Sequence, residues 1–165
     1  MIVYHPIDDV YHCFCRLALL ISHLPPKECE IKKLQILDFY FLFPGLIKNM
    51  RFPKELRLYR DYADNFKVPY TSIDSPKELI VHLEHQAIEV THQMASYDLI
   101  DIEKLKENLV LCTNRDKYAA IIQKIKNYDE ELLKFLTSVL AEIPLNGKKG
   151  LKERTGIFEW RYDNG

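Results

Sequence analysis

KKLQILDFYFLFP, residues 32–44, is the stretch that decides the fold. Phe39 to Phe43 are apolar on every side of the expected helix, and such a helix is buried on most of its faces. The Pro44–Gly45 pair then breaks it. A helix that begins near Cys29 and runs to this break is therefore predicted to form the centre of the core. Asp38 enters that core and must find a hydrogen-bond partner or stay at its edge, because an unpaired buried carboxylate is costly.

The segments on either side of this stretch also predict helices. Asp8 or Asp9 can cap a helix that runs to about His23, because its apolar residues recur at three- and four-residue steps. The Pro25–Pro26 pair ends that helix. Beyond the stretch, residues 46–66 are expected to form one short and one longer helix.

The middle of the chain predicts a helix, a short helix and a strand. Residues 75–78, Ser-Pro-Lys-Glu, supply a helix cap, a proline at the first helical position and a glutamate that can close a capping box. The helix that follows is expected to stop near residues 96–98. Asp101 can cap the short helix, and the apolar run 109–113 is rich enough in β-formers to be a strand. This order of elements is that of a winged-helix unit.

The last third of the chain predicts one long helix. It runs from Asp116 to about Ile143, because apolar residues alternate steps of three and four, and Pro144 stops it. The same spacing fits packing within the chain's own domain or docking on another chain. After it, residues 146–150 are expected to form an exposed basic loop, and residues 156–162 a final short strand with the only Trp.

Together these elements predict a mostly α-helical chain: a helical domain with a winged-helix-like unit and a long C-terminal amphipathic helix. The 165 residues are expected to form a single compact domain over 1–165, since a chain of this size can bury roughly 68–70% of its unfolded surface. The winged-helix-like core is expected within residues 8–113. A helical extension and the C-terminal segment occupy residues 114–165.

The composition argues against several classes of protein. With 23 Lys and Arg against 24 Asp and Glu, the formal net charge is -1, so no global field draws the chain to nucleic acid or an anionic membrane. No apolar run approaches the ~18 residues that span a bilayer, and the N-terminus lacks the pattern of a signal peptide. A cytoplasmic protein with no membrane contact is expected. Its four cysteines should be reduced structural residues.

Among the possible kinds of chemical site, only a metal site has candidate residues at a suitable spacing in this sequence. His85, Glu89 and His92 stand at i, i+4 and i+7 of a helix and could meet one ion, although a solvated polar face accounts for them more simply. The sequence has no nucleophile elbow and no glycine-rich phosphate loop. We therefore expect no enzyme activity, no catalytic residue, no metal and no cofactor.

Two basic segments are the candidate contact sites for a partner protein or DNA. In the first, arginines are interleaved with aromatic residues, a mixture that suits both nucleic-acid and protein interfaces. Its candidate residues are Lys48, Arg51, Lys54, Arg57 and Arg60. The second segment lies at the C-terminus and combines a basic cluster, which also includes Lys152, with aromatic side chains. Its candidate residues are Lys148, Lys149, Arg154, Trp160 and Tyr162.

Four stretches together resemble a known family. They are MIVYHPIDDVYHCFCRLALL (1–20), KLQILDFYFLFPGLIKNMRFP (33–53), MASYDLIDIEKLKENLVLCT (94–113) and GLKERTGIFEWRYDNG (150–165). The chain is similar in them to the middle-component proteins of bacterial ABC-three-component defence systems, which are related in arrangement to Lamassu-type systems. The matching motifs are hydrophobic and structural, and no catalytic residue carries over.

The resemblance implies a non-enzymatic accessory subunit. Its partners would be a large ATPase of the SMC or Rad50 kind and a separate, often nuclease-like effector, and double-stranded DNA could be held through the complex. A winged-helix element would belong to the subunit that joins the ATPase to the effector. Two alternatives remain: a stand-alone winged-helix DNA-binding protein, which the net charge of -1 disfavours, and, last, a metal-dependent hydrolase.

Overall fold

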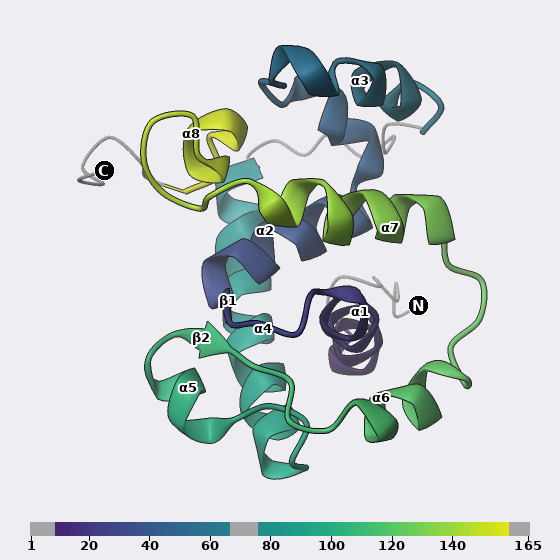
Figure 1. Ribbon diagram of the computed structural model, residues 1–165, viewed down its shortest axis with the longest axis vertical. Coiled ribbons are helices and arrows are strands. Elements are labelled where there is room, and N and C mark those ends of the chain that lie inside the picture. The colour runs from purple at the N-terminus through teal and green to yellow at the C-terminus, as the bar shows by residue number, and fades with distance from the viewer. Residues whose placement is uncertain (1–8, 67–75, 159–165) are drawn as a thin grey trace, which may run out of the picture.

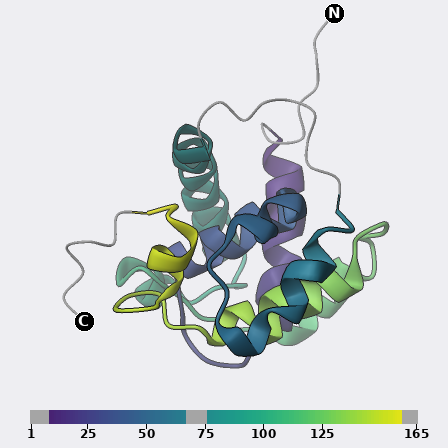
Figure 2. The ribbon, with the colours of Figure 1, turned by 90° about the horizontal axis from the view of Figure 1, so that it is seen from above.

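The computed structural model of the chain describes residues 9–66 and 76–158 (Figure 1). Four helices pack against one another at its centre: α1 (Val10–His23), α2 (Ile31–Leu42), α4 (Pro76–Ser96) and α7 (Glu130–Ser138). Seen from above, α1 and α4 lie beside each other in this centre (Figure 2). The predicted mostly α-helical class is confirmed.

Helix α2 is the buried element that its sequence predicts. Eight of its twelve residues are buried, and Phe39 and Tyr40 are only 2% and 3% exposed. The helix ends where Phe43 leaves the helical region, with φ -125° and ψ 62°, directly before Pro44. The decisive stretch therefore packs α1, α4 and α7 around itself, because its apolar surface faces all of them.

Helix α1 begins and ends at polar and proline signals. The Asp9 carboxylate accepts hydrogen bonds from the backbone N–H groups of Tyr11 at 2.7 Å and His12 at 3.2 Å, which satisfies two donors that no carbonyl in the helix can reach. Leu24 is extended, with ψ 150°, because it precedes Pro25. Asp9 is thus the cap of the predicted helix.

The predicted strand is present but short. Strand β2 (Leu109–Val110) pairs antiparallel with β1 (Cys29–Glu30), with Cys29 opposite Val110. Between α4 and β2, Asp101 caps α5 (Ile102–Lys106) as expected. Helix α4 begins at Pro76, whereas Ser75 lies outside the described residues. The winged-helix unit stays a prediction.

The single long helix predicted over 116–143 is wrong. The chain forms α6 (Arg115–Ile122), turns, and starts again as α7. Within the turn Asn127 has φ +64°, a left-handed conformation that asparagine tolerates and a helix does not contain. The Asp129 carboxylate accepts a hydrogen bond from Leu132 N at 2.9 Å and caps α7. Both helices pack on α1, so one apolar spacing continues through two helices that face the same core.

A group of short helices covers one end of these helices. It consists of η2 (Pro44–Asn49), η3 (Lys54–Leu56), α3 (Leu58–Ala63) and α8 (Leu151–Thr155). Figure 1 shows α3 and α8 together at the top of the molecule and α5 and α6 at the opposite end. Two distinct regions are therefore visible, a helical core and a cover of short segments.

The final strand predicted over 156–162 is absent from the part of it that the structure describes. Gly156 ends α8 with φ +66°, a left-handed conformation that glycine adopts without strain. Ile157 and Phe158 then follow in a bend. Residues 159–162 lie outside the described residues.

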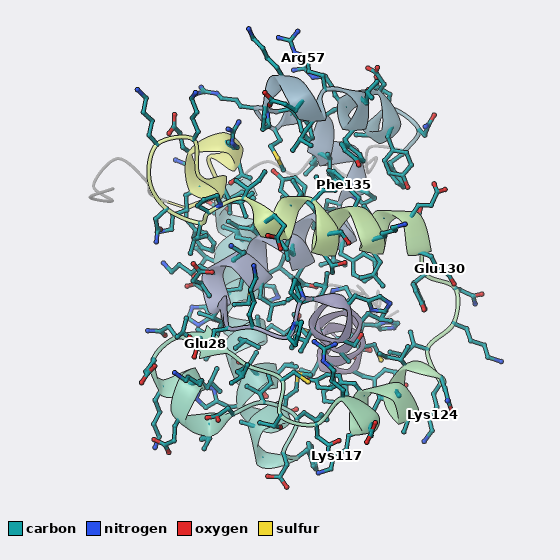
Figure 3. The ribbon with its side chains drawn as sticks, in the orientation of Figure 1. Glu28, Arg57, Lys117, Lys124, Glu130 and Phe135 are labelled. Atoms are coloured by element: carbon teal, nitrogen blue, oxygen red, sulfur yellow. The ribbon has the colours of Figure 1, made fainter. Side chains whose placement is uncertain are left out.

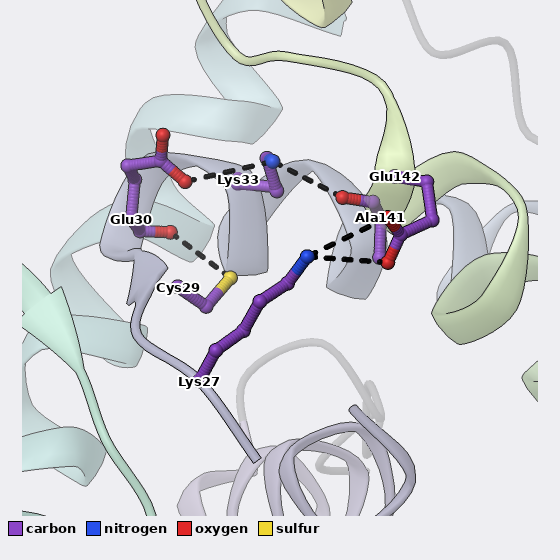
Figure 4. A network of polar contacts seen from close by, with 6 residues as sticks. All are labelled: Lys27, Cys29, Glu30, Lys33, Ala141 and Glu142. Atoms are coloured by element: carbon purple, nitrogen blue, oxygen red, sulfur yellow. Dashed lines mark hydrogen bonds and ion pairs between the residues drawn. The ribbon is translucent and has the colours of Figure 1, made fainter. Parts of the chain in front are cut away.

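A polar network ties the start of α2 to η4 (Leu140–Glu142), which follows α7 (Figure 4). Lys33 Nζ donates to the Ala141 carbonyl at 3.1 Å and lies 3.6 Å from the Glu30 carboxylate. The Lys33 side chain is only 12% exposed, so water replaces these bonds poorly. The network fixes the chain after α7 against the α2 N-terminus. No described helix has the length and apolar character that a membrane crossing requires.

Candidate interaction site

The two basic segments predicted from the sequence meet at one groove. Arg154 Nη1 donates to the Arg51 carbonyl at 2.9 Å across 103 residues of chain, and Arg51 N donates to the Arg154 carbonyl at 3.0 Å. These reciprocal bonds join the segment before η3 to α8 beside a groove of about 500 Å³. The groove is lined by Arg51, Phe52, Pro53, Lys54, Glu55, Lys149, Glu153 and Arg154.

An aromatic cluster attaches η3 and α3 to the helical core. The Tyr59 ring stacks on Phe135 of α7 at a centroid distance of 4.5 Å, and Phe52 approaches the same ring at 6.5 Å. Phe135 is 4% exposed and lies directly beneath α3 (Figure 3). Tyr59 and Phe52 therefore fix the segment that carries the cations and direct the charged side chains outward.

The other wall of the groove is held by α8. Leu151 is fully buried, and Arg154 Nε donates to the Lys149 carbonyl. Gly150 allows the backbone at the start of α8 to lie close to Asn146, because a Cβ atom at Gly150 would lie 2.5 Å from the Asn146 carbonyl oxygen. Lys149 N donates to the Glu153 carboxylate at 2.7 Å. The position of Lys149 at the groove is thus determined by backbone contacts on both sides.

The predicted basic residues differ in exposure. Arg51, Lys54, Arg57 and Arg60 are exposed, as are Lys148 and Lys149, whereas Lys48 and Arg154 are half-buried. Lys152, which the sequence groups with the second cluster, is only 9% exposed, because the side of α8 next to Leu151 packs inward. Trp160 and Tyr162 lie outside the described residues, so their contact role stays a prediction.

The groove belongs to a strongly charged region. We call residues 44–66 and 145–158 the basic cap and residues 9–43 and 76–144 the helical body. The basic cap holds nine Lys and Arg against four Asp and Glu, a net charge of +5. The helical body holds 12 Lys and Arg against 16 Asp and Glu, a net charge of -4. The overall charge of -1 therefore hides two regions of opposite sign.

A second hollow, of about 680 Å³, lies between α1, the end of α2 and the turn before α7. Arg16 lines it and pairs with Asp38 through two hydrogen bonds, Nε to Oδ1 at 2.7 Å and Nη2 to Oδ2 at 3.1 Å. Burial opposes the guanidinium charge, but the Asp38 carboxylate outweighs it and raises the pKa of Arg16. The sequence predicted that Asp38 finds a hydrogen-bond partner or stays at the edge of the core. It did not identify Arg16 as that partner, although Arg16 stands three residues after Cys13 and therefore shares a buried face of α1 with it.

The histidines of α4 do not gather into a centre. His85, Glu89 and His92 are exposed, and His92 Nδ1 lies 2.8 Å from the Ile88 carbonyl. No group of three potential metal ligands is found among residues 9–66 and 76–158. All four cysteines are free, and burial is the main cause that raises the pKa values of Cys13 and Cys29 to about 12.

The fold and the groove define a small, mostly helical protein with a basic cap and a groove lined largely by charged side chains. A family model described as "ABC-three component (ABC-3C) system Middle Component 5" matches residues 2–163. The chain therefore belongs to the middle component 5 family of ABC-three-component defence systems, in which a middle component is an accessory part. The resemblance seen in the sequence is confirmed at this level. No curated protein and no solved structure matches the chain.

Proposed function

We propose that this chain is a non-catalytic cytoplasmic subunit that joins an SMC-like or Rad50-like ATPase to the nuclease-like effector of its ABC-three-component system. The observation that carries this proposal is the family match over residues 2–163, since a middle component implies other components. The chain would need no metal or cofactor for such a role.

Two surfaces are the candidate contacts of this subunit. The basic cap presents arginines beside half-buried aromatic residues, the side chains that dominate the energy of many interfaces. Within it Leu58 is 78% exposed next to Arg57, so apolar area is available as well. The second surface is the C-terminal segment with Trp160 and Tyr162.

Co-purification tests the proposal. The tagged chain is expressed from its native operon, and an ATPase and an effector should be recovered with it at fixed stoichiometry. A 19.5 kDa monomer without a companion contradicts the proposal.

A truncation after Phe158 tests the C-terminal surface. This truncation keeps Leu151 and Ile157, which are 0% and 9% exposed, so the fold should survive while recovery of a partner is lost. Truncation after Gly150 is the wrong control, because it removes both of these buried side chains. Undiminished recovery with the Phe158 truncation rejects the C-terminal contact.

A further inference from the structure

We infer that the basic cap binds the phosphate backbone of double-stranded DNA without reading its sequence. This inference deepens the proposed function, because it names what one of the two contact surfaces takes. It rests on the arrangement of five exposed cations, Arg51, Lys54, Arg57, Arg60 and Lys149, and on the absence of ion pairs for them among the residues that the structure describes.

A row of cations runs along η3 and α3. Lys54, Arg57 and Arg60 follow one another at three-residue spacing, and all three are exposed. Residues three apart nearly eclipse in a 3₁₀-helix and are neighbours in an α-helix, about 5–6 Å between Cβ atoms. Arg57 points away from the molecule at the end opposite to Lys117 and Lys124 (Figure 3). Successive cations of the row can therefore contact successive phosphates of one strand.

The groove adds cations beside this row. Arg51 and Lys149 line it together with Lys54, and the Arg154 guanidinium that joins its walls is fixed by the Arg51 and Lys149 carbonyls. The backbone positions of Arg51 and Lys149 are thus set before any ligand binds. Binding then costs the ordering of side chains only, which favours association.

The cations of the row and groove are not neutralised within the described chain. Arg51, Lys54, Arg57, Arg60 and Lys149 form no ion pair with a carboxylate of residues 9–66 or 76–158. Some exposed cations of the helical body are paired: Lys104 lies 2.7 Å from Glu28 and Lys106 lies 2.7 Å from Glu103. Exposed cations without an internal partner retain their full attraction for an external anion.

Phosphates fit this surface better than the carboxylates of a partner protein. The cation row extends beyond the groove, as a linear polyanion requires, and guanidinium groups bind phosphate oxygens in pairs. The helical body, at -4, is repelled by DNA, so the field turns the cap toward the duplex. Phosphate contacts carry no sequence information, and the described cap offers no helix long enough to fill a groove of DNA.

The salt dependence of binding by the purified full-length chain is the first test. Fluorescence anisotropy with a labelled 20-base-pair duplex is measured between 50 and 300 mM KCl. Five cations on phosphates predict a log–log slope of about -4 to -5. Two duplexes of unrelated sequence should give equal affinity. No binding at 50 mM KCl, or a slope near zero, overturns the inference and leaves the proposed function intact.

Two matched charge reversals locate the site. Lys54→Glu with Arg57→Glu and Arg60→Glu should weaken binding at least about tenfold and reduce the slope by about 3. The control, Lys124→Glu with Lys126→Glu and Lys134→Glu, makes the same charge change on exposed residues of the helical body and should weaken it less than about threefold. Equal losses overturn the inference, because net charge alone then explains binding. Circular dichroism confirms that both variants fold.

Co-purification of the cap variant separates this inference from the proposed function. If the variant loses its affinity for DNA and still recovers the ATPase and effector, the result supports both the inference and the proposed function. If it loses its partner proteins and keeps DNA affinity, the cap is a protein interface and the inference is overturned. Poly-glutamate of matched charge should compete poorly with the duplex, and equal competition also overturns the preference for phosphate.

Discussion

The helical body and the basic cap treat charge in opposite ways. In the body, Arg16 and Asp38 are 9% and 1% exposed and neutralise each other between α1 and α2. In the cap, Arg57 and Arg60 are exposed and form no ion pair within the described residues. A buried pair fixes how two helices meet, whereas unpaired surface cations contribute to contacts with other molecules. The Arg16–Asp38 pair is thus part of the core, whereas the Arg57 and Arg60 charges face solvent.

The two regions also differ in how they are held. The body buries continuous helix faces, so its residues open only when the whole core opens. Within η2, η3 and α3 the buried side chains are few, Ile47 and Ala63, and Tyr59 and Phe52 add their contacts with Phe135. We expect the cap to open at a lower free energy than the body.

Loss of the buried ion pair should have the largest effect. Asp38→Ala leaves the Arg16 charge buried without its carboxylate, and we expect the free energy of unfolding to fall by about 3–5 kcal/mol. Urea denaturation measures it. The double variant Arg16→Met with Asp38→Leu removes both charges and should regain most of that loss. If the double variant is as unstable as the single one, the pair does not determine the structure of the body.

Removal of the aromatic anchor should follow in size. Phe135→Ala deletes a ring that is 4% exposed and should cost about 3 kcal/mol. Because Tyr59 then loses its stacking partner, amide exchange in α3 should accelerate more than in α1. Phe135→Leu keeps most of the apolar volume and should preserve more of the protection. Equal acceleration in both helices would show that the cap and the body unfold as one unit.

Alkaline pH should weaken the body through its buried thiols. Burial, with the nearby Asp38 charge, raises the pKa of Cys13 from 9.0 to about 12. Between these values the unfolded chain releases a proton that the folded chain retains, so stability falls as pH rises, by up to about 1.4 kcal/mol per pH unit. Urea midpoints at pH 8, 9 and 10 measure the slope. Cys13→Ala should reduce it, and an unchanged slope assigns the effect to other groups.

The body was largely predictable from its sequence. Its signals are local, since Asp9 and Asp101 cap their own helices and the apolar string of α2 requires burial. The break before α7 was missed, because Asn127 and Asp129 are weak signals inside a continuous apolar spacing. Only tertiary packing on α1 distinguishes two helices from one.

The cap was predictable as two charged segments and not as one site. Composition shows that residues near Arg51 and near Arg154 are basic, but their contact spans 103 residues and depends on backbone carbonyls, which every residue has. Burial of Lys152 was not predicted either, because it depends on how α8 packs against the rest of the chain. Charge patterns identify residue types, and only the fold shows which of these charges face water.

Charge reversal in the cap should change stability least. Arg57→Glu with Arg60→Glu alters exposed residues that form no ion pair in the part of the chain that the structure describes, so the free energy of unfolding should stay within about 0.5 kcal/mol of wild type. A small gain is expected at low salt, because the cap's mutual repulsion decreases, and it should vanish in 1 M salt. Lys104→Glu in the body provides the contrast: it breaks a 2.7 Å contact with Glu28 and should destabilise. If reversal in the cap destabilises more than Lys104→Glu does, the cap cations are engaged inside the chain, and the contrast between Lys104 and the cap cations fails.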